Sequence, residues 1–260
     1  MSNTITLFQK AKESGRPLAL VTAYDATMAA LAQAAGVDAL LVGDSLGMVV
    51  QGSDNTLSVT LHEMIYHTKL VVRGAPDMFV ITDLPFMSYQ VSPENALRSA
   101  GLALKEGRAH AVKLEGGEEI TPQVRALIAA GIPVMAHLGL QPQSIHLYGG
   151  YGKRGKTAAE QRKLLASAQA LQDAGAFALV LENIPHNLAA EITRTLEMPT
   201  IGIGAGPACD GQVQVFHDLL GLRPGFKPRH AKRYTEAGRT IIKGLARFVQ
   251  EVREGSFVSR

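Results

Sequence analysis

The sequence predicts an α/β protein folded as a TIM (β/α)8 barrel, with residues 1–260 forming a single domain. The chain has 260 residues, 46% of them apolar, and one barrel of this class takes about 250 residues. Short apolar runs rich in Val, Ile and Leu alternate with helical stretches, a pattern typical of β/α units around a parallel sheet. Several of these helical stretches end at a glycine just before the next apolar run, as helices that turn back into a strand do.

The expected strands are apolar throughout, as parallel strands covered on both faces must be. A doubly wound open sheet is the alternative, but the number of repeats and the chain length favour a closed barrel. The eight expected strands are residues 18–24, 39–44, 79–85, 111–115, 133–139, 178–183, 199–204 and 213–217.

Two further helices are expected at the ends of the chain. Residues 4–14 form an amphipathic pattern that stops at Gly15, and we expect this short helix to close the bottom of the barrel. The long pattern that begins at His230 predicts a final outer helix, lying against the barrel or a neighbouring subunit.

Composition excludes several classes of protein. The 26 basic and 23 acidic residues give a net charge of only +3, so nucleic acid is not an expected partner. The single cysteine, Cys209, rules out an internal disulfide framework and fits a reducing compartment. No apolar run approaches the roughly 20 residues that span a bilayer, and the first residues lack a signal-peptide core. We therefore expect a cytoplasmic protein without a membrane partner.

Polar side chains stand at or near the carboxyl ends of five apolar runs. In a barrel all these ends open on one face, so the side chains should converge there. The alternative is that such residues cap the following helices, which is common for a single acid but explains a series of five less well. The residues are Asp44 with Ser45, Asp83, Glu115, His137 and Glu182.

Three of these acids indicate a metal site. Asp44, Asp83 and Glu115 offer hard oxygen ligands without sulfur, a set that favours Mg²⁺. Lys113 lies two residues before Glu115, so both side chains point to the same face of one strand. A lysine inside a barrel needs anionic partners, which these acids would supply.

Three other motifs are less informative. Residues 150–157, GYGKRGKT, match the Walker A pattern, but they follow a polar stretch instead of a buried strand; a mobile active-site lid over residues 149–157 is the better interpretation. His62, Glu63 and His67 resemble a zinc-protease motif, but histidines five apart leave a common helix face. The glycines of TIGIGAG follow the seventh strand, where barrels often bind phosphate, and their role stays open.

The ordered motifs VTAYD, VGDSLGM, ITDLPFM, VKLEGG, AHLGL, YGGY, LVLE and IGIGAG resemble the ketopantoate hydroxymethyltransferase family over nearly the whole chain. The resemblance implies a TIM barrel of the phosphoenolpyruvate/pyruvate type that uses Mg²⁺ and takes 5,10-methylenetetrahydrofolate as co-substrate. It also implies a homodecamer of two pentameric rings. The reaction implied is transfer of a hydroxymethyl group to 3-methyl-2-oxobutanoate, in pantothenate biosynthesis.

The resemblance also assigns roles to residues. Metal ligands would be Asp44, Asp83 and Glu115, and the catalytic base would be Glu182. Substrate contacts would come from Asp44, Ser45, Asp83 and Lys113, with His137 as an additional hydrogen-bond partner. A carbon–carbon lyase or phosphonomutase on the same barrel, an NTPase that uses GYGKRGKT, and a non-catalytic binding barrel are the alternatives.

Overall fold

The computed structural model describes residues 4–223, 225 and 232–258. The chain forms two compact units, Met1–Val213 and Gln214–Arg260, and we describe each by itself. That residues 1–260 make one domain therefore remains a prediction.

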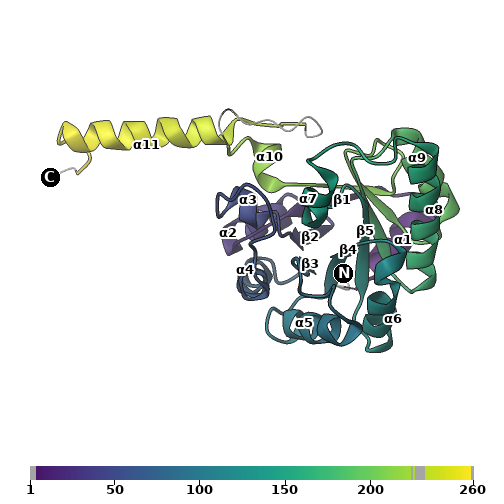
Figure 1. Cartoon of the computed structure of the whole chain (residues 1–260). Helices are drawn as coiled ribbons and strands as arrows, with labels where there is room; N and C mark the ends of the chain where they lie inside the picture. The colour runs from purple at the N-terminus through teal and green to yellow at the C-terminus, as the bar shows by residue number, and fades with distance from the viewer. Residues whose placement is uncertain (1–3, 224, 226–231, 259–260) are drawn as a thin grey trace. The chain divides into compact units, whose positions relative to one another are not determined.

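The strands form a closed parallel barrel in sequential order, from β1 to β8 (Figure 1). Each of the first seven strands pairs in parallel with the next one along the chain. The TIM (β/α)8 fold predicted from the sequence is thus confirmed. The strands are β1 (Leu18–Thr22), β2 (Ala39–Val42), β3 (Phe79–Asp83), β4 (Ala111–Glu115), β5 (Val134–Gly139), β6 (Ala178–Glu182), β7 (Thr200–Ile203) and β8 (Gly211–Gln214).

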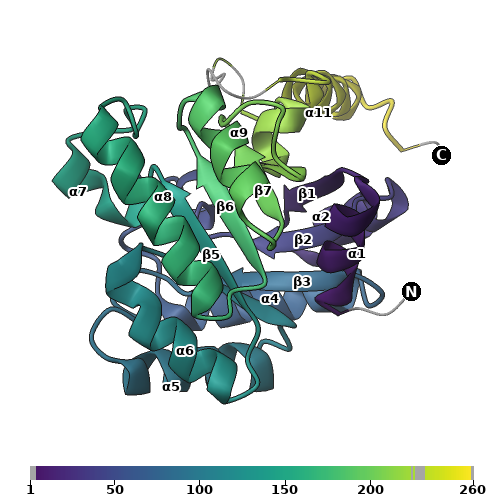
Figure 2. The ribbon, with the colours of Figure 1, turned by 90° about the vertical axis from the view of Figure 1, so that its right-hand side faces the viewer.

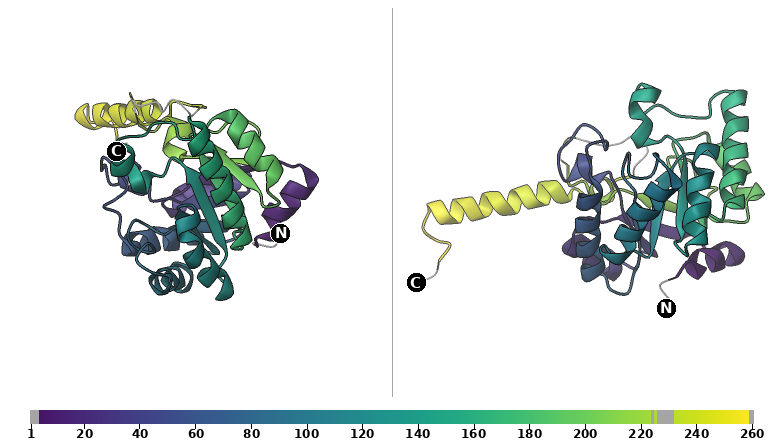
Figure 3. Two further views of the ribbon diagram at one scale, coloured as in Figure 1. Left: turned by 45° about the vertical axis from the view of Figure 1, so that its right-hand side comes forward. Right: turned by 60° about the horizontal axis from the view of Figure 1, so that its bottom comes forward.

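Helices of the first unit lie around the outside of the strands, as Figures 2 and 3 show. They are α1 (Thr6–Ser14), α2 (Ala26–Ala34), α3 (Leu46–Val49), α4 (Leu61–Gly74), α5 (Pro93–Lys105), α6 (Thr121–Ala129), α7 (Ile145–Tyr148), α8 (Ala158–Asp173) and α9 (His186–Thr195), with 3-10 turns η1 (Glu118–Ile120) and η2 (Pro142–Ser144). Side chains of Asp25, Thr60, Ser92 and Thr157 cap α2, α4, α5 and α8 by accepting backbone N–H bonds.

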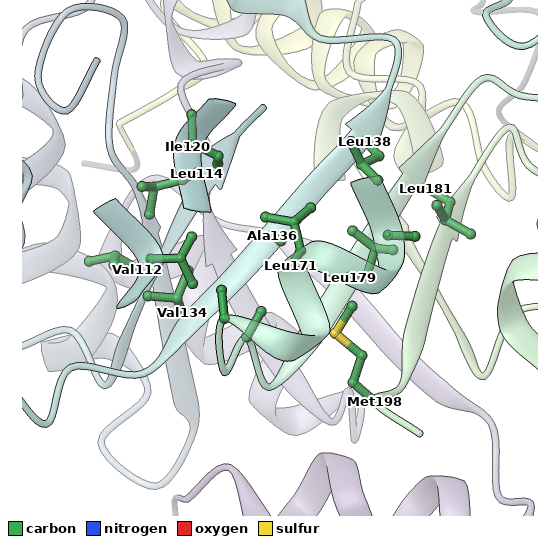
Figure 4. Close-up of a cluster of buried hydrophobic side chains, with 14 of the residues drawn as sticks. Val112, Leu114, Ile120, Val134, Ala136, Leu138, Leu171, Leu179, Leu181 and Met198 are labelled. Atoms are coloured by element: carbon green, nitrogen blue, oxygen red, sulfur yellow. The ribbon is translucent and has the colours of Figure 1, made fainter. Parts of the chain in front are cut away.

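Residues along the strands from β2 to β5 are buried throughout and alternate between two layers. In β4, Val112 and Leu114 pack outward in a cluster that also contains Leu171 of α8 (Figure 4). Ala111 belongs instead to the inner cluster that fills the barrel. Lys113 and Glu115 follow Ala111 at intervals of two, so they share its inward direction.

The inner cluster is apolar at the start of the strands, where α1 seals it. Phe8 of α1 is fully buried and makes edge-to-face contacts with Phe79 and Phe177, with ring centroids 5.7 and 5.1 Å apart. Lys12 fastens the helix by donating to Thr193 O and Asp210 Oδ2, both at 3.0 Å. The prediction that this helix closes the bottom of the barrel is confirmed.

The eighth strand was predicted in the wrong place. Residues 213–217 were expected to form it, but β8 is Gly211–Gln214 and Val215 already precedes α10 (Phe216–Leu220). The strand alternates buried Gly211 and Val213 with half-buried Gln212 and Gln214. Because half of its residues are polar, it lacks the continuous apolar run by which the other strands were predicted. The more apolar residues 213–216, VQVF, were therefore included in the predicted strand, although Phe216 is already the first residue of α10.

The second unit contains α10 and the long helix α11 (Ala237–Arg253). The final helix therefore begins seven residues later than predicted, and His230 lies outside the described residues. Within the described part of the chain, no helix is both long and apolar enough to cross a bilayer.

Candidate active site

Strand register brings the predicted site residues together at the carboxyl end of the barrel. Asp83 of β3 pairs with Lys113 of β4. Glu115 of β4 pairs with His137 of β5, and Glu182 at the end of β6 lies beside Gly139. All these side chains lie above the apolar inner layer, because each follows an inner-layer residue of its strand at an interval of two or, for Glu115, four.

Asp44 and Ser45 come from the loop that follows β2. The backbone N–H of Asp44 donates to Asp83 Oδ2 at 3.1 Å, which joins the ends of β2 and β3. The Ser45 hydroxyl lies 2.8 Å from the Tyr24 hydroxyl. Although Ser45 holds the N-cap position of α3, its side chain makes no capping bond, so capping does not explain this hydroxyl.

Lys113 is buried among the acids. Its Nζ lies 3.2 Å from Asp83 Oδ1 and 3.8 Å from Glu115 Oε1. Burial by itself disfavours the ammonium ion, but the carboxylates of Asp83, Glu115 and Asp44 outweigh burial and raise the pKa of Lys113. Lys113 is therefore a fixed positive charge inside the barrel, paired as the sequence predicted.

His137 joins Glu115 to Glu182. Its Nδ1 lies 3.4 Å from Glu115 Oε1 and its Nε2 lies 3.3 Å from Glu182 Oε2. Burial and the charge of Lys113 lower the pKa of His137, but the hydrogen bonds to the two glutamates prevail and raise it to about 9. At neutral pH the imidazole is therefore protonated and lies between the two carboxylates, with Lys113 Nζ 3.2 Å from its Nδ1.

The three deeper acids divide according to their neighbours. Burial, reinforced by the charges of Asp83 and Glu115, raises the pKa of Asp44 well above its ordinary value. Burial also raises the pKa of Asp83, against the opposing charge of Lys113. For Glu115 burial is outweighed by the bonds and charge of His137 and by Lys113, so its pKa is lowered. Three buried carboxylates thus face only two buried cations, Lys113 and His137.

Glu182 does not cap the helix that follows it. The N-cap of α9 is Pro185, and no side chain makes a capping bond there. Gly139, with φ of 97°, lets β5 pass so close that a Cβ would lie 2.2 Å from the Glu182 carbonyl oxygen. The capping alternative is therefore excluded for Glu182, whose carboxylate faces His137.

Two buried polar residues of the site were missed by sequence reasoning. Gln143, in η2, donates from Nε2 to Asp44 Oδ2 at 2.9 Å and from its backbone N–H to Glu115 Oε2 at 3.0 Å. Tyr89 lies 2.9 Å from Gln143 Oε1 through its hydroxyl. Neither lies at a strand end, because Tyr89 is six residues beyond β3 and Gln143 four beyond β5, so the pattern that found the acids could not find them.

The donor set fits a divalent cation, although no ready-made cage exists. Among the described residues no three His, Cys, Asp or Glu side chains are arranged as a complete metal-binding group. Mg²⁺ does not need one, because it binds through one or two carboxylates and keeps several waters. Asp83 Oδ1 and His137 Nε2 are buried without a well-directed hydrogen bond, even though Lys113 and Glu182 lie 3.2 and 3.3 Å from them. These two atoms are therefore available to bind a polar ligand.

The two misleading motifs have structural roles. Thr157 of GYGKRGKT caps α8 in a capping box with Glu160, and the segment follows α7, not a strand. Glu63 forms the same kind of box with Thr60, and His67 Nδ1 lies 2.6 Å from Tyr24 O. Neither segment has the context that its motif requires.

Comparison with solved structures defines the class of barrel. At 19% identity, the chain resembles 2,3-dimethylmalate lyase, a member of the PEP mutase/isocitrate lyase superfamily, with a TM-score of 0.61 over 98% of this chain and 89% of that one. It resembles a phosphonopyruvate hydrolase solved with oxalate and Mg²⁺ at 14% identity, with a TM-score of 0.65 over 98% and 88%. The fold is therefore that of these TIM barrels.

Sequence comparison identifies the family. The model of ketopantoate hydroxymethyltransferase matches residues 2–260. The 3-methyl-2-oxobutanoate hydroxymethyltransferase of Carboxydothermus hydrogenoformans is 52% identical over 98% of this chain and 92% of that protein. The protein of the same name from Thermus thermophilus is 53% identical over 99% and 97%. The chain belongs to the ketopantoate hydroxymethyltransferase family and is an enzyme, a transferase.

Proposed function

We propose that this enzyme transfers a hydroxymethyl group from 5,10-methylenetetrahydrofolate to 3-methyl-2-oxobutanoate, giving ketopantoate for pantothenate and coenzyme A biosynthesis. One observation carries the proposal beyond family membership. Three buried carboxylates, a buried lysine and a His137–Glu182 pair converge at the carboxyl end of one barrel. Such a site offers both a place for a small anionic keto acid and a base beside it.

Asp44, Asp83 and Glu115 would hold Mg²⁺, which favours oxygen donors of this kind. When bound, Mg²⁺ would stabilise negative charge on the oxygens of the keto acid. Burial, together with neighbouring carboxylate charge, raises the pKa of Asp44 and Asp83, and this supports the assignment because a bound cation would favour their ionised forms.

The remaining residues bind and orient the keto acid. Lys113 supplies a fixed positive charge toward its carboxylate and keto oxygens, and burial makes that charge more effective. Ser45, held by Tyr24, offers a hydroxyl to the same end of the substrate. The apolar inner layer beneath the acids excludes water from below.

Glu182 acts as the base that takes the proton from C3. It lies beside His137, whose Nε2 is 3.3 Å from Glu182 Oε2 and whose Nδ1 is 3.4 Å from Glu115 Oε1. This contact orients the Glu182 carboxylate while C3 loses its proton. C3 then forms a bond to the one-carbon unit, whose two C–N bonds to the folate break, and water supplies the hydroxyl group. The proton taken by Glu182 and the second proton of the water pass to the two folate nitrogens, and tetrahydrofolate leaves.

The test is to incubate the purified protein with 3-methyl-2-oxobutanoate, methylenetetrahydrofolate and Mg²⁺ and to follow ketopantoate by mass spectrometry. We expect product only with both substrates, and we expect a chelator to stop its formation until Mg²⁺ is restored. Cleavage of 2-hydroxy acids without one-carbon transfer would instead indicate a lyase. Full turnover in excess chelator would contradict the metal assignment.

We further propose that the enzyme is cytoplasmic and assembles as a homodecamer of two pentameric rings. The lone buried cysteine supports a reducing compartment. Association is supported by the second unit, where α11 carries exposed apolar side chains along one stripe, among them Ile241, Leu245 and Phe248. An exposed patch of this kind marks an interaction surface in many proteins.

A further inference from the structure

Gln143 occupies an unusual position in the barrel, because one side chain reaches the ends of several strands. It lies in η2, after β5. Its Nε2 donates to Asp44 Oδ2, beyond β2, and to Leu84 O, beyond β3, at 2.9 and 3.0 Å. Its backbone N–H donates to Glu115 Oε2, at the end of β4, at 3.0 Å.

The other end of this amide is held as firmly. Its Oε1 lies 2.9 Å from the Tyr89 hydroxyl and 3.1 Å from Gln90 Nε2. A primary amide has two N–H donors and a carbonyl oxygen with two lone pairs, so all four positions of Gln143 are used. In this orientation the amide nitrogen faces two oxygen acceptors, Asp44 Oδ2 and Leu84 O, and the amide oxygen faces Gln90 Nε2 and the Tyr89 hydroxyl.

Tyr89 anchors this arrangement to the backbone of β4. It is fully buried, and its hydroxyl lies 2.8 Å from Glu115 O and 3.1 Å from the Glu115 backbone N–H, which donates to it. Tyr89 thus holds the main chain of Glu115, and the Gln143 backbone N–H holds its carboxylate.

We propose that Gln143, held by Tyr89, is a positioning residue that fixes the Asp44 and Glu115 carboxylates for the divalent cation and the keto acid. It engages one oxygen of each carboxylate, Oδ2 of Asp44 and Oε2 of Glu115. Glu115 Oε1 is left facing Lys113 and His137, and Asp44 Oδ1 is left for a ligand. Partners of this kind determine which way a ligating carboxylate points.

This inference rests on the proposed function, and the experiment separates the two. Mn²⁺ binding is measured by the electron paramagnetic resonance signal of the free ion, with and without 3-methyl-2-oxobutanoate, in wild type and variants. Gln143→Met keeps the size of the side chain and the backbone bond to Glu115 but removes the amide. Tyr89→Phe keeps the ring and removes only the hydroxyl.

Gln123 provides the matched control. It is also a buried glutamine, 7% exposed against 5% for Gln143. Among the described residues, its one hydrogen bond to this region is a long one, 3.5 Å from Nε2 to Tyr89 O, and it makes none to the site carboxylates. Gln123→Met therefore tests the effect of losing a buried amide while the hydrogen bonds of Gln143 to Asp44 and Glu115 remain.

We expect Gln143→Met to weaken Mn²⁺ binding about 10- to 100-fold, with a higher KM for the keto acid and a smaller change in kcat. Tyr89→Phe should weaken binding in the same direction by a smaller factor, and Gln123→Met should bind within about twofold of wild type. Binding by Gln143→Met at the wild-type level would overturn the proposal, as would an equal loss in Gln123→Met. If Gln143→Met does not fold, unchanged binding in Tyr89→Phe overturns it. Wild type that binds no Mn²⁺ and forms no ketopantoate would overturn the proposed function itself.

Discussion

Glu182 differs from the other acids in its surroundings. Its carboxylate is partly exposed, with 17% of the side chain accessible, whereas those of Asp83 and Glu115 are 3% accessible. A carboxylate at the rim of the buried cluster reaches a substrate atom without entering the cluster. We therefore expect Glu182→Gln to fold and bind keto acid but to lose exchange of the C3 proton with deuterated water by at least about 10²-fold. Nuclear magnetic resonance of the keto acid measures this rate, and exchange at the wild-type rate would place the base elsewhere.

His137 makes the stability of the metal-free protein depend on pH. Its pKa rises from 6.5 to about 9 on folding, so its stabilising contribution is complete below pH 6.5 and is lost as pH rises through 9. The full contribution corresponds to about 3 kcal/mol. We expect the unfolding free energy of the wild type, measured by urea denaturation with a chelator, to fall more between pH 6.5 and 9.5 than that of His137→Gln. Parallel curves for the two proteins would contradict the assignment.

At the scale of elements, the sequence predicted what depends on local pattern. Asp83, Lys113 and Glu115 were found because an inward residue recurs every second position along a strand that the apolar run already reveals. Gln143 and Tyr89 were not found, because their importance comes only from closure of the barrel, which brings η2 against β2 and β4. Strand β8 was misplaced for a related reason, since Gly211 and Gln212 look like loop residues until β7 and β1 flank them.

The segment of residues 149–157 is tied to the residue after Glu182. Asn183 Nδ2 donates to Tyr151 O at 3.2 Å, and the Arg154 N–H donates to Asn183 O at 3.0 Å. If the segment is a lid, trypsin cleavage at Lys153, Arg154 and Lys156 should slow when both substrates bind. Asn183→Gly removes the amide at a φ of 47° that glycine accepts, and cleavage there should become faster.

The matched control for this experiment is Arg108→Gly, which alters another non-glycine residue of positive φ, at 64°. It should leave cleavage of the segment unchanged, as followed by mass spectrometry of the fragments. Cleavage that is unaffected by substrates would mean that the segment is only exposed.

Thr157 tests the Walker-like motif at the end of the same segment. Because it caps α8, Thr157→Ala should lower the free energy of unfolding by about 1 kcal/mol. Thr60→Ala, which breaks the equivalent box of α4, should cost a similar amount. Calorimetry should detect no ATP binding to the wild type; ATP binding that Thr157→Ala abolishes would restore the P-loop interpretation.

At the scale of the whole molecule, the two units differ in how their apolar side chains are covered. In the first unit the outer cluster between strands and helices contains residues from β4 to β6 packed against α8 (Figure 4). In α11 the apolar side chains are exposed instead, and only Gly238 of the helix is buried. A helix with one apolar stripe is stabilised mainly by burying that stripe, so we expect α11 to bind a partner surface.

The proposed homodecamer can be tested through this stripe. Leu245 is 60% exposed and lies near its centre, flanked by Ile241, Phe248 and Val252. A lysine at position 245 would place a charge where association removes water, at a large desolvation cost. Gln250 lies on the far side of the helix, about 140° around its axis from Leu245, so Gln250→Lys adds the same charge to the polar face. Light scattering coupled to size exclusion should give ten times the mass of one chain for wild type and Gln250→Lys, and a smaller assembly for Leu245→Lys. A decamer that survives Leu245→Lys would show that the stripe does not hold it together, and a monomeric wild type would contradict the assembly itself.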